Sequence, residues 1–140
     1  EMEKIFGEEH INLSDLESKC NALKSKFPNL KILLKLGKYG CAYSDSKRYI
    51  TCPSVSQINP KVLEDHKIVD TVGAGDCFTA TFFYKYLQKV KDNKDDDQDI
   101  KDCMVFANSS AFLCITKHGA MPSMPIESEV QDLIKNYSLV

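Results

Sequence analysis

A glycine-rich turn closed by a carboxylate is the part of this chain whose residue types best suit chemistry. Residues 70–76 have the sequence Asp-Thr-Val-Gly-Ala-Gly-Asp, and an apolar stretch with helical spacing follows at once. Backbone N–H groups at such a turn, just before a helix, form a natural binding site for phosphate oxygens. Asp76 stands at the mouth of that site, where its carboxylate could accept the proton of an attacking hydroxyl. The glycine turn (residues 70–76) therefore indicates phosphoryl transfer to a hydroxyl group.

The first residues of the predicted helix supply the donors for this chemistry. Gly73 and Gly75 tolerate positive φ angles and let another group come close to the backbone. The N–H groups of Ala74, Gly75 and Asp76 would then point at one spot and stabilise the charge on a moving phosphoryl group. The alternative interpretation is a glycine turn whose aspartate only caps the helix.

Alternating strand and helix patterns surround the glycine turn. A capping box at Ser14 and Glu17 begins a helix that ends before Pro28. Residues 53–66 are polar, contain two prolines and are predicted to form a surface loop. The alternation predicts an α/β fold with helices packed on a sheet. The other predicted elements are strands at 30–36, 41–43, 49–52 and 67–69, and helices at 77–90, 100–116 and 127–137.

Charge and composition exclude several classes of function. The net charge is −2 and apolar residues make up 43% of the chain, so we expect one domain and no nucleic acid or membrane as partner. No apolar run is long enough to cross a bilayer, and the first residues lack the pattern of a secretory leader. The six cysteines have neither zinc spacing nor a secretory context, and we interpret them as reduced core thiols of a cytoplasmic protein. The acidic residues 95–99 lack the pattern of a calcium loop and are predicted to be a solvated connection.

Four stretches of the chain resemble one enzyme family. Residues 70–83 are similar to the second signature of the ribokinase-type carbohydrate kinases, Asp-Thr-x-Gly-Ala-Gly-Asp-x-Phe. Residues 34–41 resemble the family's strand and turn Thr-Leu-Gly-x-x-Gly, although Lys35 stands where Thr is usual. Residues 106–111 resemble the helix that lines the adenine pocket. Residues 116–125 are similar to the segment Thr-Arg-Lys-Gly-Ala-Gln-Pro-Ser-Val-Pro of the ribokinase branch of the family.

The resemblance implies a role for each residue of the catalytic turn. Asp76 would be the general base and would contact the sugar hydroxyl. The anion hole would be formed by the backbone of Gly73, Ala74, Gly75 and Asp76. Without the resemblance, Gly37 and Gly40 would be equally compatible with a simple β-turn, and Asn108 would be interpreted as a polar residue satisfied inside a helical core. The residues implied to bind the nucleotide are Lys35, Leu36, Gly37, Lys38, Tyr39, Gly40, Gly75, Asp76 and Asn108.

The resemblance also implies a co-substrate and two metal ions. ATP would be the co-substrate, and Glu3 would help to organise Mg²⁺. Hard oxygen ligands would suit K⁺ as an activator, although Asp70 by itself could equally cap a local turn. The residues implied to hold K⁺ are Asp70, Val72, Cys114, Lys117, Gly119 and Ser123.

The resemblance covers nearly the whole chain but only the C-terminal half of the family's fold. It implies half of a three-layer α/β/α fold, with residues 1–140 as the nucleotide-binding part of a kinase domain and with the lid and the N-terminal half absent. We therefore expect a truncated or incomplete sequence that is inactive alone. The intact enzyme would transfer the γ-phosphoryl group of ATP to the 5-hydroxyl of D-ribose and would form a homodimer through its lid. The alternatives are a kinase of fructose or adenosine, or a non-catalytic nucleotide-binding fragment.

Overall fold

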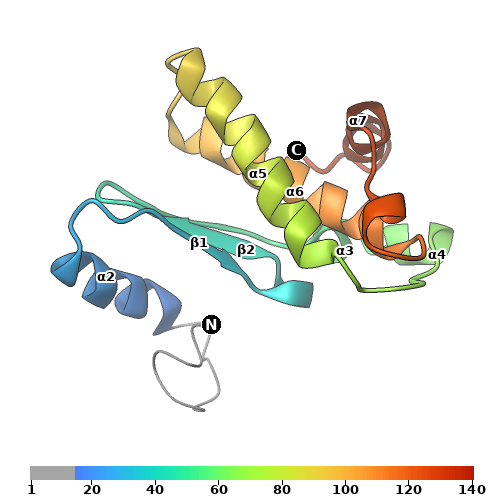
Figure 1. The fold of residues 1–140 in the computed structure, drawn as a ribbon, viewed down its shortest axis with the longest axis horizontal. Helices are drawn as coiled ribbons and strands as arrows, with labels where there is room; N and C mark the ends of the chain where they lie inside the picture. The colour runs from blue at the N-terminus through green and yellow to red at the C-terminus, as the bar shows by residue number, and fades with distance from the viewer. Residues whose placement is uncertain (1–14) are drawn as a thin grey trace.

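A small antiparallel sheet with helices on both sides makes up residues 15–140, the part of the chain that the computed structural model describes (Figure 1). The predicted cap Ser14 lies outside the described residues, and the helix that follows it begins at Leu16. The elements are α2 (Leu16–Lys26), β1 (Ile32–Lys35), η2 (Gly37–Tyr39), β2 (Cys41–Ser44), β3 (Tyr49–Cys52), α3 (Val55–Ile58), α4 (Val62–Asp65), α5 (Ala74–Lys91), α6 (Asp97–Ile115), η3 (Met121–Ser123) and α7 (Glu127–Asn136).

The sheet is a meander in the order β1-β2-β3, and both strand pairs are antiparallel. The predicted hairpin is confirmed, because β2 and β3 pair from Cys41 opposite Cys52 to Ser44 opposite Tyr49. Side chains alternate between the two faces of the sheet. One face packs on α2 through a small cluster of Leu16, Cys20, Leu34 and Ala42. The other face joins the main core through Cys41, Tyr43, Ile50 and Cys52.

Helices α5 and α6 pack against each other and cover the face of the sheet opposite to α2 (Figure 1). On α5, Phe78, Phe82 and Tyr86 recur every four residues and are buried, with the Phe82 ring stacked on both others. Phe83 and Leu87 belong to the same predicted stripe but are 47% and 62% exposed. Only one side of the apolar stripe is therefore buried within the described residues.

The two C-terminal helices agree with their sequence patterns. Helix α6 is buried on nearly every side, as its apolar sequence predicts. Helix α7 buries Val130 and Leu133, and Ile134 packs against the same core. All six cysteines are buried and unpaired, in agreement with their interpretation as core thiols.

The prediction of a surface loop at residues 53–66 is wrong. The segment forms the short helices α3 and α4, because Val55 and Val62 are buried in the main core. The N–H group of Ser54 donates to the side chain of Gln57 at 3.1 Å, which supports the start of α3. The apolar residues Val55, Ile58 and Val62 are spaced three and four positions apart, but Pro60 and the polar residues between them interrupt this helical period, so the tertiary structure is needed to identify the anchors.

The prediction of a strand at residues 67–69 is also wrong. The N–H groups of Val69 and Asp70 both donate to the carbonyl oxygen of Ile115, at 2.8 and 3.2 Å. A strand needs a neighbouring strand, and this segment meets the end of α6 instead. The two hydrogen bonds fix the entry to the glycine turn against α6.

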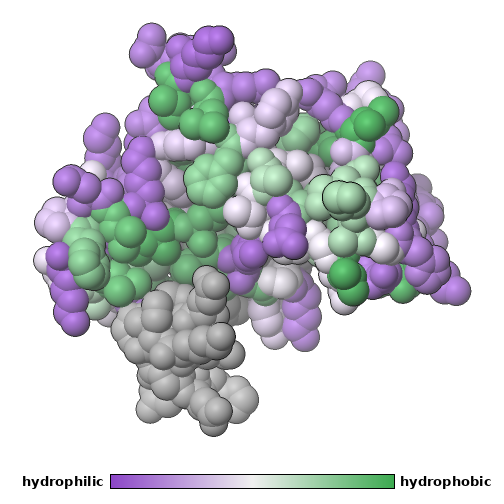
Figure 2. Space-filling view, in the orientation of Figure 1, coloured by the Kyte–Doolittle hydropathy of each residue, from purple (hydrophilic) through white to green (hydrophobic). Residues whose placement is uncertain are grey.

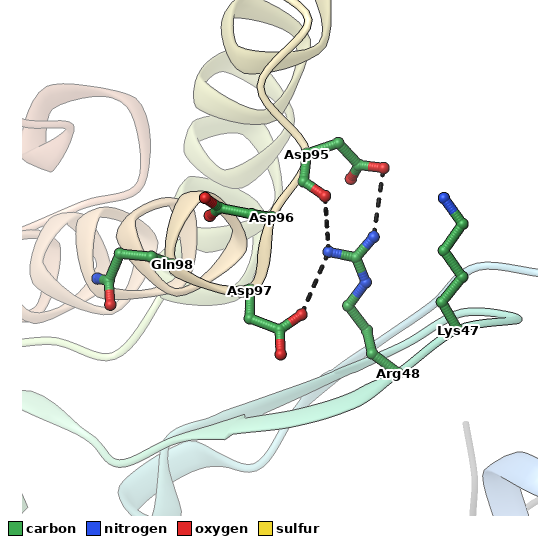
Figure 3. A pocket seen from close by; sticks show the side chains of 6 residues that line it. All are labelled: Lys47, Arg48, Asp95, Asp96, Asp97 and Gln98. Carbon is green, nitrogen blue, oxygen red and sulfur yellow. Dashed lines mark hydrogen bonds and ion pairs between the residues drawn. The ribbon is translucent and has the colours of Figure 1, made fainter.

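The loop between α5 and α6 is held to the β2–β3 hairpin by Arg48, whose side chain is only 9% exposed. Figure 3 shows the guanidinium donating to the carbonyl oxygen and carboxylate of Asp95, at 2.9 and 3.3 Å, and to the carboxylate of Asp97, at 3.4 Å. These residues line a cavity of about 610 Å³. The cavity lies at the end of α5 opposite to the glycine turn, and a helix of this length separates the two sites by about 27 Å.

We expect Arg48→Met to lower the free energy of unfolding by about 2 kcal/mol, because a guanidinium with several partners is lost and those partners are left unpaired. The matched control is Lys47→Met, since the exposed Lys47 side chain makes no ion pair with residues 15–140. Urea denaturation of both variants measures the difference. An equal loss of stability in the two variants would contradict this role for Arg48.

Candidate active site

The glycine turn leads directly into α5, and Gly73 is the N-cap of this helix. Gly73 has a φ of +84°, and a Cβ atom at this position would lie 2.8 Å from the Cα atom of Ala120. Only glycine allows both the angle and the close approach. The Ala74 N–H group makes a long bond of 3.4 Å to the carbonyl oxygen of Thr71. The N–H groups of Gly75 and Asp76 therefore remain as donors that lack an acceptor within the helix.

Asp76 lies in the exposed first turn of α5. Among residues 15–140 its carboxylate has no hydrogen-bond or ion-pair partner, so it is open to an incoming hydroxyl. The Nζ atom of Lys35 lies 3.3 Å from the carbonyl oxygen of Gly75. The end of β1 thus brings a positive charge to the same turn. This approach joins residues 40 positions apart, and the sequence pattern gave no signal for it.

The turn at residues 36–40 packs on the chain that leaves β3. The N–H group of Leu36 donates to the carbonyl oxygen of Gly40 at 2.8 Å, which closes the predicted turn. Gly40 has a φ of +89°, and a Cβ atom there would lie 2.1 Å from the carbonyl oxygen of Cys52. The Ser54 hydroxyl donates to the carbonyl oxygen of Lys38 at 2.8 Å. Ser54 thus supports this turn, although its sequence context is an unremarkable polar stretch.

Asn108 is buried on α6 and faces the same exit from β3. Its side-chain amide donates to the carbonyl oxygen of Pro53 at 3.0 Å and to the Sγ atom of Cys52 at 3.5 Å. The structure therefore brings both Asn108 and the 36–40 turn against residues 52–54. The Asn108 amide therefore has hydrogen-bond partners inside the protein, as expected if it is a polar residue satisfied in a helical core.

The residues implied to hold a cation come from the glycine turn and from the end of α6 with the segment that follows it, and Asp70 ties these two parts together. The Asp70 carboxylate accepts from the N–H groups of Val72 and Gly119, each at 3.0 Å. These two hydrogen bonds hold the pKa of Asp70 below its usual value. In the same region the buried hydroxyl of Ser123 lies 3.0 Å from the Sγ atom of Cys114. Lys117 follows α6, and its side chain forms an ion pair with Glu129 at 3.0 Å.

Glu3, the implied magnesium residue, lies outside the described residues. Within residues 15–140 no group of three or more His, Cys, Asp or Glu side chains is arranged to hold a metal ion. In the same part of the chain, none of the helices combines the length and the apolar character that a bilayer crossing requires.

Comparison with known protein families decides the family. The pfkB family of carbohydrate kinases matches residues 1–127, which is most of the chain. The chain belongs to the pfkB carbohydrate kinase family. This result confirms the family resemblance that the sequence motifs carried.

Curated members of the pfkB family match along nearly the whole chain. Fructokinase from Solanum tuberosum is 34% identical over 139 residues, which cover 96% of this chain and 38% of the fructokinase. Ribokinase from Arabidopsis thaliana is 30% identical over 138 residues, which cover 96% of this chain and 31% of the ribokinase. The chain therefore spans less than two fifths of the length of these relatives.

Solved structures confirm a partial α/β fold of the ribokinase type. The structure of ribokinase from Giardia lamblia has a TM-score of 0.78 at 24% identity, over 96% of this chain and 41% of that one. The structure of Arabidopsis thaliana ribokinase complexed with ribose and ATP has a TM-score of 0.67 at 29% identity, over 89% of this chain and 35% of that one. In both cases the match leaves more than half of the ribokinase uncovered.

We expect the link between Asp70 and Gly119 to weaken in acid. Because the pKa of Asp70 is depressed in the folded chain, the link is intact above the pKa of an unfolded aspartate and is lost as the pH falls through the folded pKa. The amide proton shift of Gly119, followed by NMR, should titrate with a midpoint below 3.8, the usual value. The titration should disappear in Asp70→Asn, and a midpoint above the usual value would contradict the assignment.

Proposed function

We propose that this chain is the C-terminal, nucleotide-binding part of a longer kinase that transfers the γ-phosphoryl group of ATP to D-ribose. The observation that carries the proposal is the Asp76 carboxylate in the first turn of α5, which has no partner among residues 15–140 and lies beside two backbone N–H donors and Lys35. The pfkB family and the complex of Arabidopsis ribokinase with ribose and ATP support it. A homodimeric assembly through the lid and a cytoplasmic location belong to the same proposal.

In this proposal Asp76 accepts the proton of the sugar hydroxyl while the hydroxyl oxygen attacks the γ-phosphorus. The N–H groups of Gly75 and Asp76 lie at the positive end of the α5 dipole and stabilise the charge that builds on the phosphoryl oxygens. Lys35 adds a full positive charge to the same place. The 36–40 turn and Asn108, which meet around residues 52–54, form the part of the site that we propose for the nucleoside.

A potassium ion fits the donor set between the two parts of the chain that Asp70 connects, because the carboxylate, the buried Ser123 hydroxyl and backbone carbonyls are hard oxygen ligands. The carbonyls in this proposal are those of Val72, Cys114, Lys117 and Gly119. When bound, K⁺ supplies a fixed positive charge beside the glycine turn. Asp70 positions this turn through its own hydrogen bonds. Glu3 is the residue that we propose to organise Mg²⁺, which neutralises phosphate charge in such reactions.

The proposed identity of the sugar rests on sequence similarity. Ribose is favoured by the similarity of residues 116–125 to the corresponding ribokinase segment. Fructose is the second candidate, because potato fructokinase is 34% identical to the chain and Arabidopsis ribokinase is 30% identical. Turnover of ATP by the full-length kinase should depend on ribose. Turnover with fructose or adenosine and not with ribose would overturn the ribose proposal.

Residues 1–140 alone are expected to bind ATP without phosphorylating a sugar, because in this proposal the other half of the kinase holds the sugar. Calorimetry measures ATP binding, and chromatography of labelled sugar phosphates measures transfer. Sugar phosphorylation by these 140 residues would contradict the division of roles, and failure to bind ATP would contradict the nucleotide site itself.

We expect Lys35→Met to weaken ATP binding by about tenfold, because a charge-assisted contact to phosphate is lost. Adenosine has no phosphate, so its affinity should not change. The control is Lys91→Met, which removes the same charge at the opposite end of α5. Calorimetric titration of each variant with ATP and adenosine gives the comparison. Equal losses of affinity for ATP and for adenosine would show that Lys35 does not contact phosphate.

A further inference from the structure

Two cysteines face each other directly across the β2–β3 hairpin. Cys41 and Cys52 are partners in the strand register, and they are only 1% and 4% exposed. The N–H group of Asp45 donates to the carbonyl oxygen of Arg48 at 3.0 Å and closes the hairpin. Asp45 and Arg48 are therefore a hydrogen-bonded pair, and along an antiparallel ladder every second pair of opposite residues is hydrogen-bonded. Counted from Asp45 and Arg48, the pair Cys41–Cys52 is hydrogen-bonded as well. Its Cα atoms should be about 5.5 Å apart, within the usual range for a disulfide, and formation of the bond requires the two Cβ atoms to approach each other to about 4 Å.

The two thiols have different chemical environments. The Cys52 thiol donates to the carbonyl oxygen of Pro53 at 3.6 Å, and its sulfur accepts hydrogen bonds from the Cys41 thiol and from the side-chain amide of Asn108. The two accepted hydrogen bonds and the charge of Lys101 lower the pKa of Cys52 in spite of its burial. The pKa of Cys41 is raised, because its thiol donates to Cys52 and is buried. One cysteine thus favours the nucleophilic thiolate, and its neighbour remains protonated.

We propose that Cys41 and Cys52 are a redox-active dithiol that hydrogen peroxide converts into an intrachain disulfide. The Cys52 thiolate attacks one peroxide oxygen, the O–O bond breaks, and Cys52 becomes a sulfenic acid while hydroxide leaves. The sulfur of Cys41 then attacks the Cys52 sulfur and gives up its proton, and the second hydroxide leaves as water. Two thiols and one peroxide give one disulfide and two water molecules, and an added dithiol reverses the change.

The position of the pair places this oxidation in the wall of the proposed nucleotide site. Cys41 directly follows Gly40, and the carbonyl group of Cys52 is the one against which Gly40 packs. The amide of Asn108 bridges the Cys52 sulfur and the Pro53 carbonyl. The redox chemistry does not depend on the proposed kinase function, because it rests on the hairpin and on α6 alone.

A second thiol pair in the chain provides an internal control. Cys77 on α5 and Cys114 on α6 also interact, but burial, together with the neighbouring thiol, raises the pKa of Cys77 to about 12. Within the part of the chain that the structure describes, burial and Cys114 are the causes that act on Cys77, and neither is an amide or a lysine. The Cys77 thiol therefore stays protonated, and we expect this pair to stay reduced when Cys41 and Cys52 are oxidised.

Peptide mapping of the 140-residue chain tests the proposal. After hydrogen peroxide treatment and alkylation of the remaining thiols, trypsin cleaves at Lys47 and Arg48, within the hairpin loop. The tryptic peptides 39–47 and 49–61 should then be joined, and a dithiol should separate them. Cys77 and Cys114 should be recovered alkylated. Earlier or equal linkage of Cys77 to Cys114, or recovery of both hairpin cysteines alkylated, would overturn the proposal.

Two variants separate the roles within the pair. In Cys41→Ser the Cys52 sulfenic acid has no resolving thiol, so a sulfenic-acid reagent such as dimedone should label Cys52. In Asn108→Leu the disulfide should form about tenfold more slowly, because one hydrogen bond to a thiolate shifts its pKa by about one unit. Unfolding of each variant is followed by circular dichroism. An unchanged rate in folded Asn108→Leu would remove the amide from the mechanism.

Discussion

Replacement of Asp76 by asparagine is expected to lower the turnover number of the full-length kinase by about a thousandfold, within the range that general bases contribute. Asparagine has nearly the same shape and keeps the backbone N–H group, but its side chain cannot take the proton of the sugar hydroxyl. ATP affinity should change by less than about twofold, because the Asp76 carboxylate acts on the proton of the sugar and its removal leaves the contacts with ATP in place. Steady-state kinetics and calorimetry give the two values.

The matched control for this change is Asp92→Asn, at the C-cap of the same helix. It removes one negative charge from α5 at the end far from the glycine turn, and turnover should stay within about twofold of the parent value. Turnover in Asp76→Asn equal to that in Asp92→Asn would remove Asp76 from its role as base. Loss of ATP binding in Asp76→Asn would instead assign the carboxylate to the nucleotide site.

Replacement of Gly40 by alanine is expected to lower the free energy of unfolding by about 4 kcal/mol, the sum of the penalty for a positive-φ extended backbone and a severe overlap. Gly40 has a φ of +89°, and the new Cβ atom would lie 2.1 Å from the carbonyl oxygen of Cys52 and 2.7 Å from the backbone nitrogen of Ser54. These are backbone atoms, so no side-chain rotation can relieve the overlap. Urea denaturation followed by circular dichroism measures the loss.

Gly37→Ala is the control for this prediction, since both glycines lie in the same turn and both have positive φ. A Cβ atom on Gly37 would meet nothing within 4 Å, so only the backbone penalty of about 1 kcal/mol applies. The difference between the two variants combines the packing of the 36–40 turn against the end of β3 with the more restrictive backbone conformation of Gly40, whose ψ is −131°. Similar losses in both variants would mean that this contact contributes little to stability.

The local patterns of the chain predicted most of its elements correctly, for a physical reason. The spacing of Phe78, Phe82 and Tyr86 is a helical period, and the polar turn between two apolar runs predicts the β2–β3 hairpin. Such signals depend on residues within a few positions of each other. The glycine turn is equally local, because its glycines and Asp76 lie within seven residues. Its chemistry could therefore be proposed before the structure was known.

The errors lie where an element depends on distant segments. Residues 53–66 form helices because Val55 and Val62 enter the core, and residues 67–69 form no strand because their N–H groups meet Ile115. Leu87 fits the helical period of α5 but is exposed, because its burial depends on which segments pack against that side of the helix. A pattern along the chain shows that a residue is apolar, but it does not predict which part of the folded chain will bury that residue.

The sequence by itself determined the family and the candidate catalytic residue, because the motif around Asp76 is contiguous. Only the tertiary structure placed Lys35 beside Gly75, tied Asp70 to Gly119 and set Asn108 against Pro53 and Cys52. Each of these contacts joins residues at least 40 positions apart. They exist because β1, the exit from β3 and α6 pack together around the start of α5, and packing of this kind leaves no period in the sequence.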